Sequence, residues 1–275
     1  MSDINPYIAP TDMDKQGANP GAAEPKKPYL HVIDIRNIVH FPRLNSQSGA
    51  YEGNIILKPG TYPIRLYQTP DKQNIGFETS GDADAMGIAN KIEGSYPGYN
   101  REFAALIHNL LGQGLVVIRE LITGEHQLIG SDAIPVYMGS NYTSDATSNT
   151  VTCSFGSTMN TNVPVYYYDG EIPTATQVAV DAAATTIDAS AGRFFRMQNA
   201  SGDTAVTIAS ITGGQDGDVI SLIGSFGDKP ANVKATDDIL LCKGAQWNAV
   251  EGSVLSLRAM EVAAGALVWI EIDRK

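Results

Sequence analysis

The hydrophobic and polar positions follow different patterns along the chain, and the main change lies near residue 171. Between residues 29 and 170, short apolar runs rich in β-branched residues alternate with polar turns, and one segment has helical spacing. From residue 171 to 275 the apolar runs are shorter and are separated by Gly, Asp and Asn. Residues 1–28 show almost no apolar periodicity. These patterns predict an extended arm, a β-rich domain and a second β domain.

One segment of the first domain, residues 100–111, predicts an α-helix. Asn100 can cap the first turn, which also contains Glu102. Gly112 follows the last apolar position and can end the helix. The spacing of one buried helix face is given by Phe103, Leu106, Ile107, Leu110 and Leu111.

The rest of the first domain is expected to be mainly strands. A strand starts at Leu30 and is ended by Pro42, with a bulge at Asn37. Further strands are expected at Gln73–Glu78, Leu115–Glu120, Gln127–Ile129, Ile134–Met138, Thr150–Phe155 and Val163–Tyr168.

Two connections in this domain are specific predictions. Gly53–Leu57 and Thr61–Tyr67 are expected to form a hairpin, because the intervening Lys-Pro-Gly has the residues of a tight turn. The stretch Thr79–Asn100 is rich in Gly, Asp and Asn and is expected to be a long loop, long enough to suggest a role beyond connection.

The second domain is expected to be all-β. Regular spacing between Gly-containing turns is typical of a sandwich or jelly roll. The whole chain is therefore predicted to be mainly β, with an N-terminal β-barrel or sandwich around one helix and this C-terminal module. The expected C-terminal strands are Thr185–Asp188, Arg193–Asn199, Ala205–Ala209, Asp218–Gly224, Asn232–Ala235, Ile239–Leu241, Ala245–Val250, Val254–Arg258 and Leu267–Ile272.

The arm, residues 1–28, has the composition of an extended segment, with five prolines and few apolar residues. It is either a disordered tail or an assembly arm that becomes ordered across a neighbouring subunit. In the second case the apolar anchors would be Ile4, Tyr7, Ile8 and Met13.

The charge of the chain argues against a grip on nucleic acid. The net charge is −11, with 3 basic against 4 acidic residues in the arm and 8 against 13 in each of the two domains. No segment can neutralise a run of phosphates, although an acidic surface can let DNA pass without binding it.

The polar start MSDINPYIAP and the lack of a long apolar run predict synthesis in the cytoplasm without a membrane span. Both cysteines, Cys153 and Cys242, lie in apolar runs and are expected to be buried free thiols.

The strongest candidate for a metal site is the stretch that begins at Asp82. Asp82 and Asp84, with Asn90 and Glu93 at the ninth and twelfth positions, follow the spacing of an EF-hand calcium loop. The fifth position is Met86, which offers no hard oxygen ligand. A plain loop explains the pattern better, so no metal or other cofactor is expected.

No other motif supports catalysis. The four histidines (His31, His40, His108 and His126) lack metal-ligand spacing and are expected to be structural or solvated. The sequence contains no nucleophile elbow, phosphate-binding loop or Cys-x-x-Cys pair. The aromatic run Tyr166–Tyr168 is expected to pack in the core and at the domain boundary, with a stacking platform for sugars or bases as the alternative.

The stretch from Ile55 to Gly170 resembles the tail-tube (major tail) proteins of long-tailed bacteriophages. The resemblance is carried by the order of strand, hairpin, long loop, single helix, a strand reading LVVIREL and a strand ending in VPVYYYDG. The C-terminal part looks like β modules that end phage fibre and tail-surface proteins, which share G-D-x-I-x-L, a later W and a closing W-x-E-I-x-R. These positions are filled by Gly217, Asp218, Ile220, Leu222, Trp247, Trp269, Glu271, Ile272 and Arg274.

This resemblance implies a structural, non-enzymatic virion protein, a tail-tube subunit that forms homo-oligomeric rings. Rings of that family stack with β-barrels closed across subunits, which leaves an acidic lumen for DNA, and the C-terminal module would decorate the outside. The implied partners are further copies of the chain, other virion proteins and DNA in passage. One alternative is a capsid-decoration, head-fibre or tail-fibre protein that binds a host surface glycan, and another is a neck-ring protein. A third is a depolymerase, for which the sequence offers no paired acids.

Overall fold

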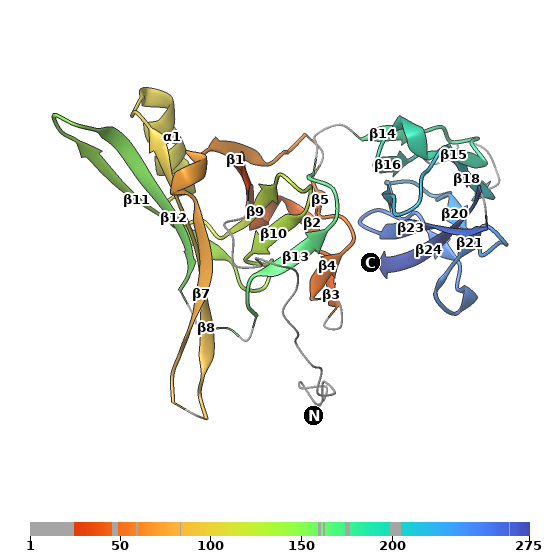
Figure 1. Ribbon diagram of the computed structural model, residues 1–275. Helices are drawn as coiled ribbons and strands as arrows, with labels where there is room; N and C mark the ends of the chain where they lie inside the picture. The colour runs from red at the N-terminus through yellow and green to blue at the C-terminus, as the bar shows by residue number, and fades with distance from the viewer. Residues whose placement is uncertain are drawn as a thin grey trace.

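The computed structural model describes residues 25–45, 49–58, 60–82, 84–158, 161, 163–173, 177–198, 205–263 and 265–275. The fold is mainly β with one α-helix, as predicted from the sequence (Figure 1). The N-terminal domain, up to residue 173, and the C-terminal domain, from residue 177, each have a hydrophobic core of their own.

The described N-terminal domain contains thirteen strands. They are β1 (Lys26–Asp34), β2 (Ile38–His40), β3 (Arg43–Asn45), β4 (Ala50–Glu52), β5 (Ile56–Leu57), β6 (Ile64–Tyr67), β7 (Asn74–Ser80), β8 (Gly87–Pro97), β9 (Leu115–Leu121), β10 (His126–Ile129), β11 (Val136–Ser144), β12 (Asn149–Ser157) and β13 (Tyr166–Asp169). Most of them belong to one sheet of order β3-β4-β13-β10-β9-β11-β12-β8-β7, with β1 joined to β9 and β6 to β1.

The single α-helix, α1 (Arg101–Leu110), confirms the helix predicted at residues 100–111. Its Asn100 cap accepts a hydrogen bond from the backbone N–H of Phe103 at 2.7 Å. Gly112 follows the helix with φ of +73°, a conformation that glycine adopts without strain. No helix among the described residues is both long and apolar enough to cross a membrane.

The strand predicted between Leu30 and Pro42 is divided in two. The Asp34 carboxylate accepts a hydrogen bond from the backbone N–H of Arg36, and residues Ile35–Asn37 form a 3₁₀ helix in place of a bulge. The chain then leaves the large sheet, because β2 pairs with β5 in a separate small sheet.

The predicted hairpin between Gly53–Leu57 and Thr61–Tyr67 is wrong. β5 pairs with β2, whereas β6 pairs with β1. The reason is that the two segments serve different cores: Leu57 packs with Tyr168 and Ile33, and Leu66 packs with the residues under α1. A turn-forming sequence between two apolar runs does not make them partners when each run is buried elsewhere.

The long loop predicted at Thr79–Asn100 is also wrong. Most of it is β8, which pairs with β7 on one side and with β12 on the other. Ile88, Ile92 and Tyr96 alternate with polar or small residues along this strand, and Ile92 is only 1% exposed. The position of β8 between β7 and β12 explains why a Gly-, Asn- and Ser-containing segment is extended.

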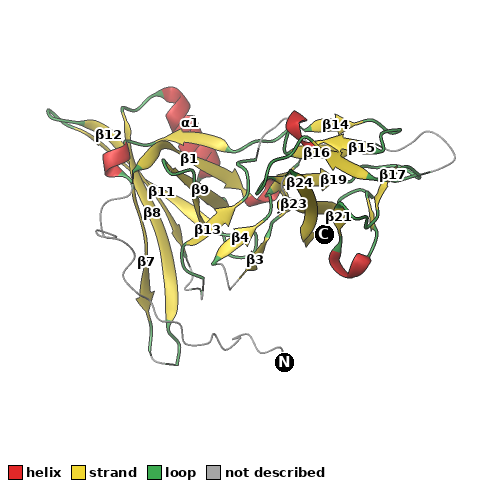
Figure 2. Ribbon diagram, turned by 45° about the vertical axis from the view of Figure 1, so that its right-hand side comes forward, coloured by secondary structure: helices red, strands yellow, loops and turns green. Residues whose placement is uncertain are grey.

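The strands β11, β12, β8 and β7 form an antiparallel four-stranded extension of the sheet. Figures 1 and 2 both show its two hairpins reaching beyond the body of the domain, β7–β8 toward one end and β11–β12 toward the other. In both views the C-terminal domain lies on the side of the N-terminal domain away from this extension.

The described C-terminal domain has eleven strands. They are β14 (Val178–Val180), β15 (Thr186–Asp188), β16 (Phe194–Met197), β17 (Thr207–Ile208), β18 (Ser210–Thr212), β19 (Val219–Ile223), β20 (Asn232–Val233), β21 (Ile239–Leu240), β22 (Trp247–Asn248), β23 (Val254–Ala263) and β24 (Ala266–Arg274). Nine of them match the predicted strands, and β14 and β18 were not predicted.

The pairing in this domain is mixed. β14, β16 and β19 run parallel and are continued by the antiparallel strands β23 and β24 in a six-stranded sheet. An antiparallel jelly roll has no such parallel rows, so the module is all-β as predicted but differs from that architecture. The resemblance run lies mainly inside the core, where Ile220, Leu222, Trp247 and Trp269 are buried together.

Candidate assembly site

The four-stranded extension has two chemically different faces, because side chains alternate along each strand. One face is turned toward the body of the domain. There Phe103 and Leu110 of α1 pack in one cluster with Val151, Cys153 and Phe155 of β12. Tyr96 of β8 stacks on Phe103 with ring centroids 4.2 Å apart. Most of this apolar face is covered by the protein's own chain, and it is called the covered face below, although Phe77 and Tyr142 near the two edges are 52% and 47% exposed.

The opposite face is polar and carries small side chains. Among the residues that β7, β8, β11 and β12 contribute to this face, only Gly87 of β8 is buried. The face lies over a hollow of about 450 Å³ whose lining includes Asn74, Gly76, Lys91 and Ser154. From the strand register, the residues of this face are Asn74, Gly76, Glu78 and Ser80 of β7, Gly87, Ala89, Lys91, Glu93, Ser95 and Pro97 of β8, Tyr137, Gly139, Asn141 and Thr143 of β11, and Thr150, Thr152, Ser154 and Gly156 of β12.

Few charges lie on this polar face. Lys91 pairs with Glu93 at 2.6 Å, and Glu78 adds a second carboxylate. The face therefore has a small negative net charge and no cluster of cations that could hold a phosphate backbone. Such a surface can lie beside a polyanion without binding it.

The extension ends in two strand edges that have no strand partner among the described residues. β7 pairs only with β8. β11 pairs with β12 along its whole length, but with β9 only at Val136, so residues 137–144 have one open side. Open edges of this length invite pairing with another strand.

The backbone groups that face these edges follow from the hydrogen bonds inside the extension. Ile88 exchanges both of its backbone hydrogen bonds with Thr161, on the side away from β7. Its partner Thr79 therefore directs its own N–H and C=O groups outward, as do Phe77 and Ile75 at alternate positions.

On β11 the orientation of the backbone groups follows from the hairpin turn. The N–H of Asp145 donates to Ser148 O. Because the direction of the backbone groups alternates along a strand, every second residue counted back from Asp145 directs its N–H and C=O groups toward β12. The residues between them, Met138, Ser140 and Tyr142, direct their N–H and C=O groups to the open side of β11. Both edges thus present regularly spaced backbone donors and acceptors.

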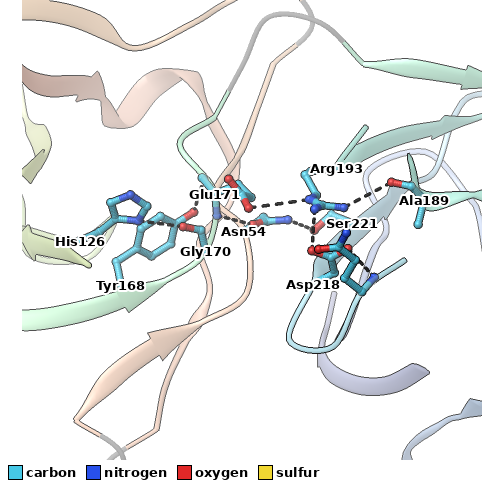
Figure 3. A network of polar contacts seen from close by, with 10 residues as sticks. Asn54, His126, Tyr168, Gly170, Glu171, Ala189, Arg193, Asp218 and Ser221 are labelled. Atoms are coloured by element: carbon cyan, nitrogen blue, oxygen red, sulfur yellow. Dashed lines mark hydrogen bonds and ion pairs between the residues drawn. The ribbon is translucent and has the colours of Figure 1, made fainter. Parts of the chain in front are cut away.

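The two domains meet in a polar network around Tyr168 and Asn54 (Figure 3). The Tyr168 hydroxyl, fully buried, donates to Glu171 O at 2.9 Å and accepts from Ile55 N at 3.0 Å. The Asn54 amide accepts from Glu171 N at 2.9 Å and donates to Ser221 Oγ of the C-terminal domain at 3.0 Å. Burial raises the pKa of Tyr168 far above its usual value, so the hydroxyl keeps its proton.

A second set of contacts closes the same junction. Ile56 of the N-terminal domain packs with Phe194, Ile223 and Val254 of the C-terminal domain. Beside them, His40 hydrogen bonds to Asp273, whose side chain is fully buried. The C-terminal domain is therefore fixed to the N-terminal domain by apolar packing and buried polar contacts as well as by the chain connection.

A cleft of about 560 Å³ lies beside this junction. It is lined by the β9–β10 turn, the end of β13 and the turn before β19, with Glu125, Asp169, Glu171 and Asp218 as its acids. Two arginines hold three of these carboxylates. Arg193 lies 2.5 Å from Asp218 and 3.8 Å from Glu171 (Figure 3), and Arg258 lies 3.8 Å from Asp169.

The structure separates the residues of the calcium-like pattern. Asp82 and Asp84 lie in the turn between β7 and β8, whereas Asn90 and Glu93 lie along β8. Glu93 lies about 20 Å along the strand from Gly87, where β8 leaves the turn. This is too far for one ion to contact both the turn and Glu93. Asn90 donates to Val163 O at 2.7 Å. Among the described residues, no three His, Cys, Asp or Glu side chains are grouped to hold a metal.

The histidines and the tyrosine run have structural surroundings in the described part of the chain. His31 and His126 contact Glu120 at 3.4 and 3.7 Å, and His108 is exposed on α1, so these histidines are structural or solvated as expected. Tyr168 is in the core and at the junction, as predicted.

The prediction for Cys242 is wrong, because this residue is exposed while Cys153 is buried. Leu241 takes the buried position, and the chain then turns outward in the 3₁₀ helix Cys242–Gly244. The proposed arm anchors Ile4, Tyr7, Ile8 and Met13 lie outside the described residues.

Comparison of the chain with family models, with curated proteins and with solved structures finds no match. The open edges and the polar face of the extension are therefore the features that point to a function. The family resemblance implied barrels closed across subunits, but the sequence did not indicate which strands would form the edges, because β8 and the outer half of β11 contain few apolar residues.

Proposed function

We propose that this protein is a ring-forming structural subunit of a bacteriophage virion, a subunit of the tail tube. The observation that carries the proposal is the four-stranded extension, with one covered apolar face, one uncovered polar face and two open edges. In the ring, the extensions of neighbouring copies join edge to edge into one continuous barrel, and the polar faces line its lumen.

The direction of the strands supports closure by rotation. Each strand of the extension is antiparallel to the next, so β7 runs opposite to β11. When copies are related by rotation about an axis, β7 of one copy meets β11 of the next in antiparallel orientation. Such a head-to-tail contact closes into a ring and leaves no open edge.

The chemistry of the polar face supports a lumen for DNA. Its hydroxyl, amide and glycine surface, with two carboxylates against one Lys, offers nothing that would hold a polyanion. DNA would pass through without specific binding. The central part of the apolar face is already buried by α1 and the domain core, whereas its outer residues Phe77 and Tyr142, next to the two open edges, are exposed.

The position of the C-terminal domain fits a decoration on the outside. It lies on the side of the N-terminal domain away from the extension (Figures 1 and 2), so it stays clear of a ring that closes through β7 and β11. The assignment to a phage rests on the sequence resemblance alone. Of the elements that carry the resemblance, α1, β9 in the LVVIREL segment and β13 in the YYYD segment are present, whereas the expected hairpin and long loop are replaced by other strand pairings.

Electron microscopy of the purified full-length protein over a range of concentrations tests the proposal. Rings or stacked tubes are expected. Phe77→Pro should prevent them, because it removes an N–H that faces the open edge and not β8, whereas Phe77→Ala keeps that N–H and should still assemble. Circular dichroism of both variants verifies that they are folded. Elongated trimers, or a monomer at every concentration, would contradict a tube subunit.

A further inference from the structure

We infer that β7 of one copy pairs with β11 of its neighbour in one register, in which Phe77 lies opposite Ser140. This inference rests on the proposed ring and specifies its contact. The partner is a second copy of this chain, because the two open edges of the extension complement each other in direction, phase and length.

The alternation of outward-directed and inward-directed backbone groups along the two edges restricts the choice of register. Ile75, Phe77 and Thr79 direct their backbone groups outward on β7, and Met138, Ser140 and Tyr142 do so on β11. Only registers that place an outward residue opposite another outward residue form an antiparallel ladder. The same registers keep the covered face and the polar face continuous from one copy to the next.

The ends of the two edges then select one register. A slip of two residues in one direction would place Thr79 opposite Val136, which is already paired with Leu115. A slip of two in the other direction would place Asn74 opposite Asp145, which belongs to the hairpin turn. Between these limits, all of residues 74–79 pair with residues 138–143.

The selected register gives compatible side-chain pairs. On the covered face Ile75 meets Tyr142, an aromatic and β-branched pair of a favourable kind. On the polar face Glu78 meets Gly139, which leaves room for the longer side chain. The remaining pairs are Asn74 with Thr143, Gly76 with Asn141, Phe77 with Ser140 and Thr79 with Met138.

The register also fits the geometry of closed barrels. Within one copy, Phe77 lies at the level of Val136 when the pairing is followed across β8 and β12. The neighbour's Ser140 is four residues away from that level, a stagger of about 13 Å over four strands of about 4.8 Å each. This corresponds to a strand tilt of about 35°, within the roughly 35–45° of closed barrels. In a single copy the β7–β8 and β11–β12 hairpins overhang in opposite directions (Figure 1), in keeping with a staggered arrangement.

Disulfide cross-linking tests the register. Gly76→Cys and Asn141→Cys are combined in one chain, with Cys242→Ser to remove the exposed thiol. A Cβ at Gly76 meets nothing within 4 Å, so the substitution is tolerated. Within one chain the two positions are about 20 Å apart, because three strand spacings and four residues along the strands separate them. This distance is beyond the reach of a disulfide. The control combines Gly76→Cys with Thr143→Cys.

Assembled protein is oxidised with copper–phenanthroline and separated without reductant. The Gly76/Asn141 variant should convert from a single monomer band into a ladder of covalent multimers, with the linked peptides identified by mass spectrometry. The Gly76/Thr143 control should remain largely monomeric. Cross-linking of the control alone would overturn this register, and rings without cross-linking of either variant would overturn β7–β11 pairing, while the proposed function would stand. Absence of any assembly by microscopy would overturn the proposed function itself.

Discussion

His40 in β2 and Asp273 in β24 form a hydrogen-bonded pair in the junction between the two domains, although 233 positions separate them in the sequence. Both side chains are buried, and the Asp273 carboxylate has Arg43 as a second, largely exposed partner at 3.4 Å. Removing one member of a buried pair leaves the other without compensation in a water-poor site. The pair therefore couples the stability of one domain to that of the other.

We expect Asp273→Ala to lower the free energy of unfolding by about 3 kcal/mol, and Asp273→Asn to lower it less because the amide oxygen still accepts a hydrogen bond. Urea unfolding followed by tryptophan fluorescence and by circular dichroism measures this. Both tryptophans are in the C-terminal core, so separation of the two transitions in Asp273→Ala would show loss of coupling. Glu251→Ala, in an exposed turn, is the control, and equal stability of Asp273→Ala and this control would refute the prediction.

Two glycines on adjacent strands offer a matched test of packing in the extension. A Cβ at Gly94 in β8 would collide with the buried side chain of Gln68, whereas a Cβ at Gly76 in β7 meets nothing within 4 Å. Gly94→Ala should cost about 1–3 kcal/mol of unfolding free energy through overpacking. Gly76→Ala should be neutral or slightly stabilising. Denaturant midpoints compare the two, and a stable Gly94→Ala protein would mean that Gln68 can move aside.

The sequence predicts α1 almost residue by residue, because its cap, its stripe and its terminating glycine are all local. It does not predict β8, whose extended form depends on β7 and β12 on either side and not on its own residues. The same is true of the outer half of β11, which is polar and exposed. The junction pair His40 and Asp273 depends on how two distant segments pack, so no spacing in the sequence could indicate it.

The histidine beside Glu120 predicts a pH dependence of stability. Burial lowers the pKa of His31 below its usual 6.5, and the neighbouring Glu120 opposes that effect only in part. Because the folded state then binds the proton less readily than the unfolded chain, stability is present above about pH 6.5 and is lost as the pH falls through the lower folded value. Glu120, whose pKa is held below its usual value by Lys27 and His31 against the effect of burial, adds a further loss at more acidic pH.

We therefore expect the unfolding free energy to fall between about pH 7 and pH 5, and His31→Gln to reduce this slope. His108→Gln is the matched control, because His108 is exposed on α1 and should leave the slope unchanged. Urea titrations at a series of pH values measure both variants. A slope that is the same in wild type and His31→Gln would show that His31 does not titrate differently in the folded and unfolded states.

The two thiols should differ sharply in reactivity. Burial raises the pKa of Cys153 to about 11, opposed only weakly by the Gln68 side chain. At pH 8 this thiol is almost entirely protonated as well as inaccessible, and the thiolate is the reactive form. Cys242 is exposed.

A thiol-specific chromogenic reagent should therefore modify one cysteine per native chain quickly, and two in denaturant. Cys242→Ser should abolish the fast reaction, whereas Cys153→Ser should leave it unchanged. Fast modification of Cys153 in the native Cys242→Ser protein would show that the covered face of the extension opens to solvent.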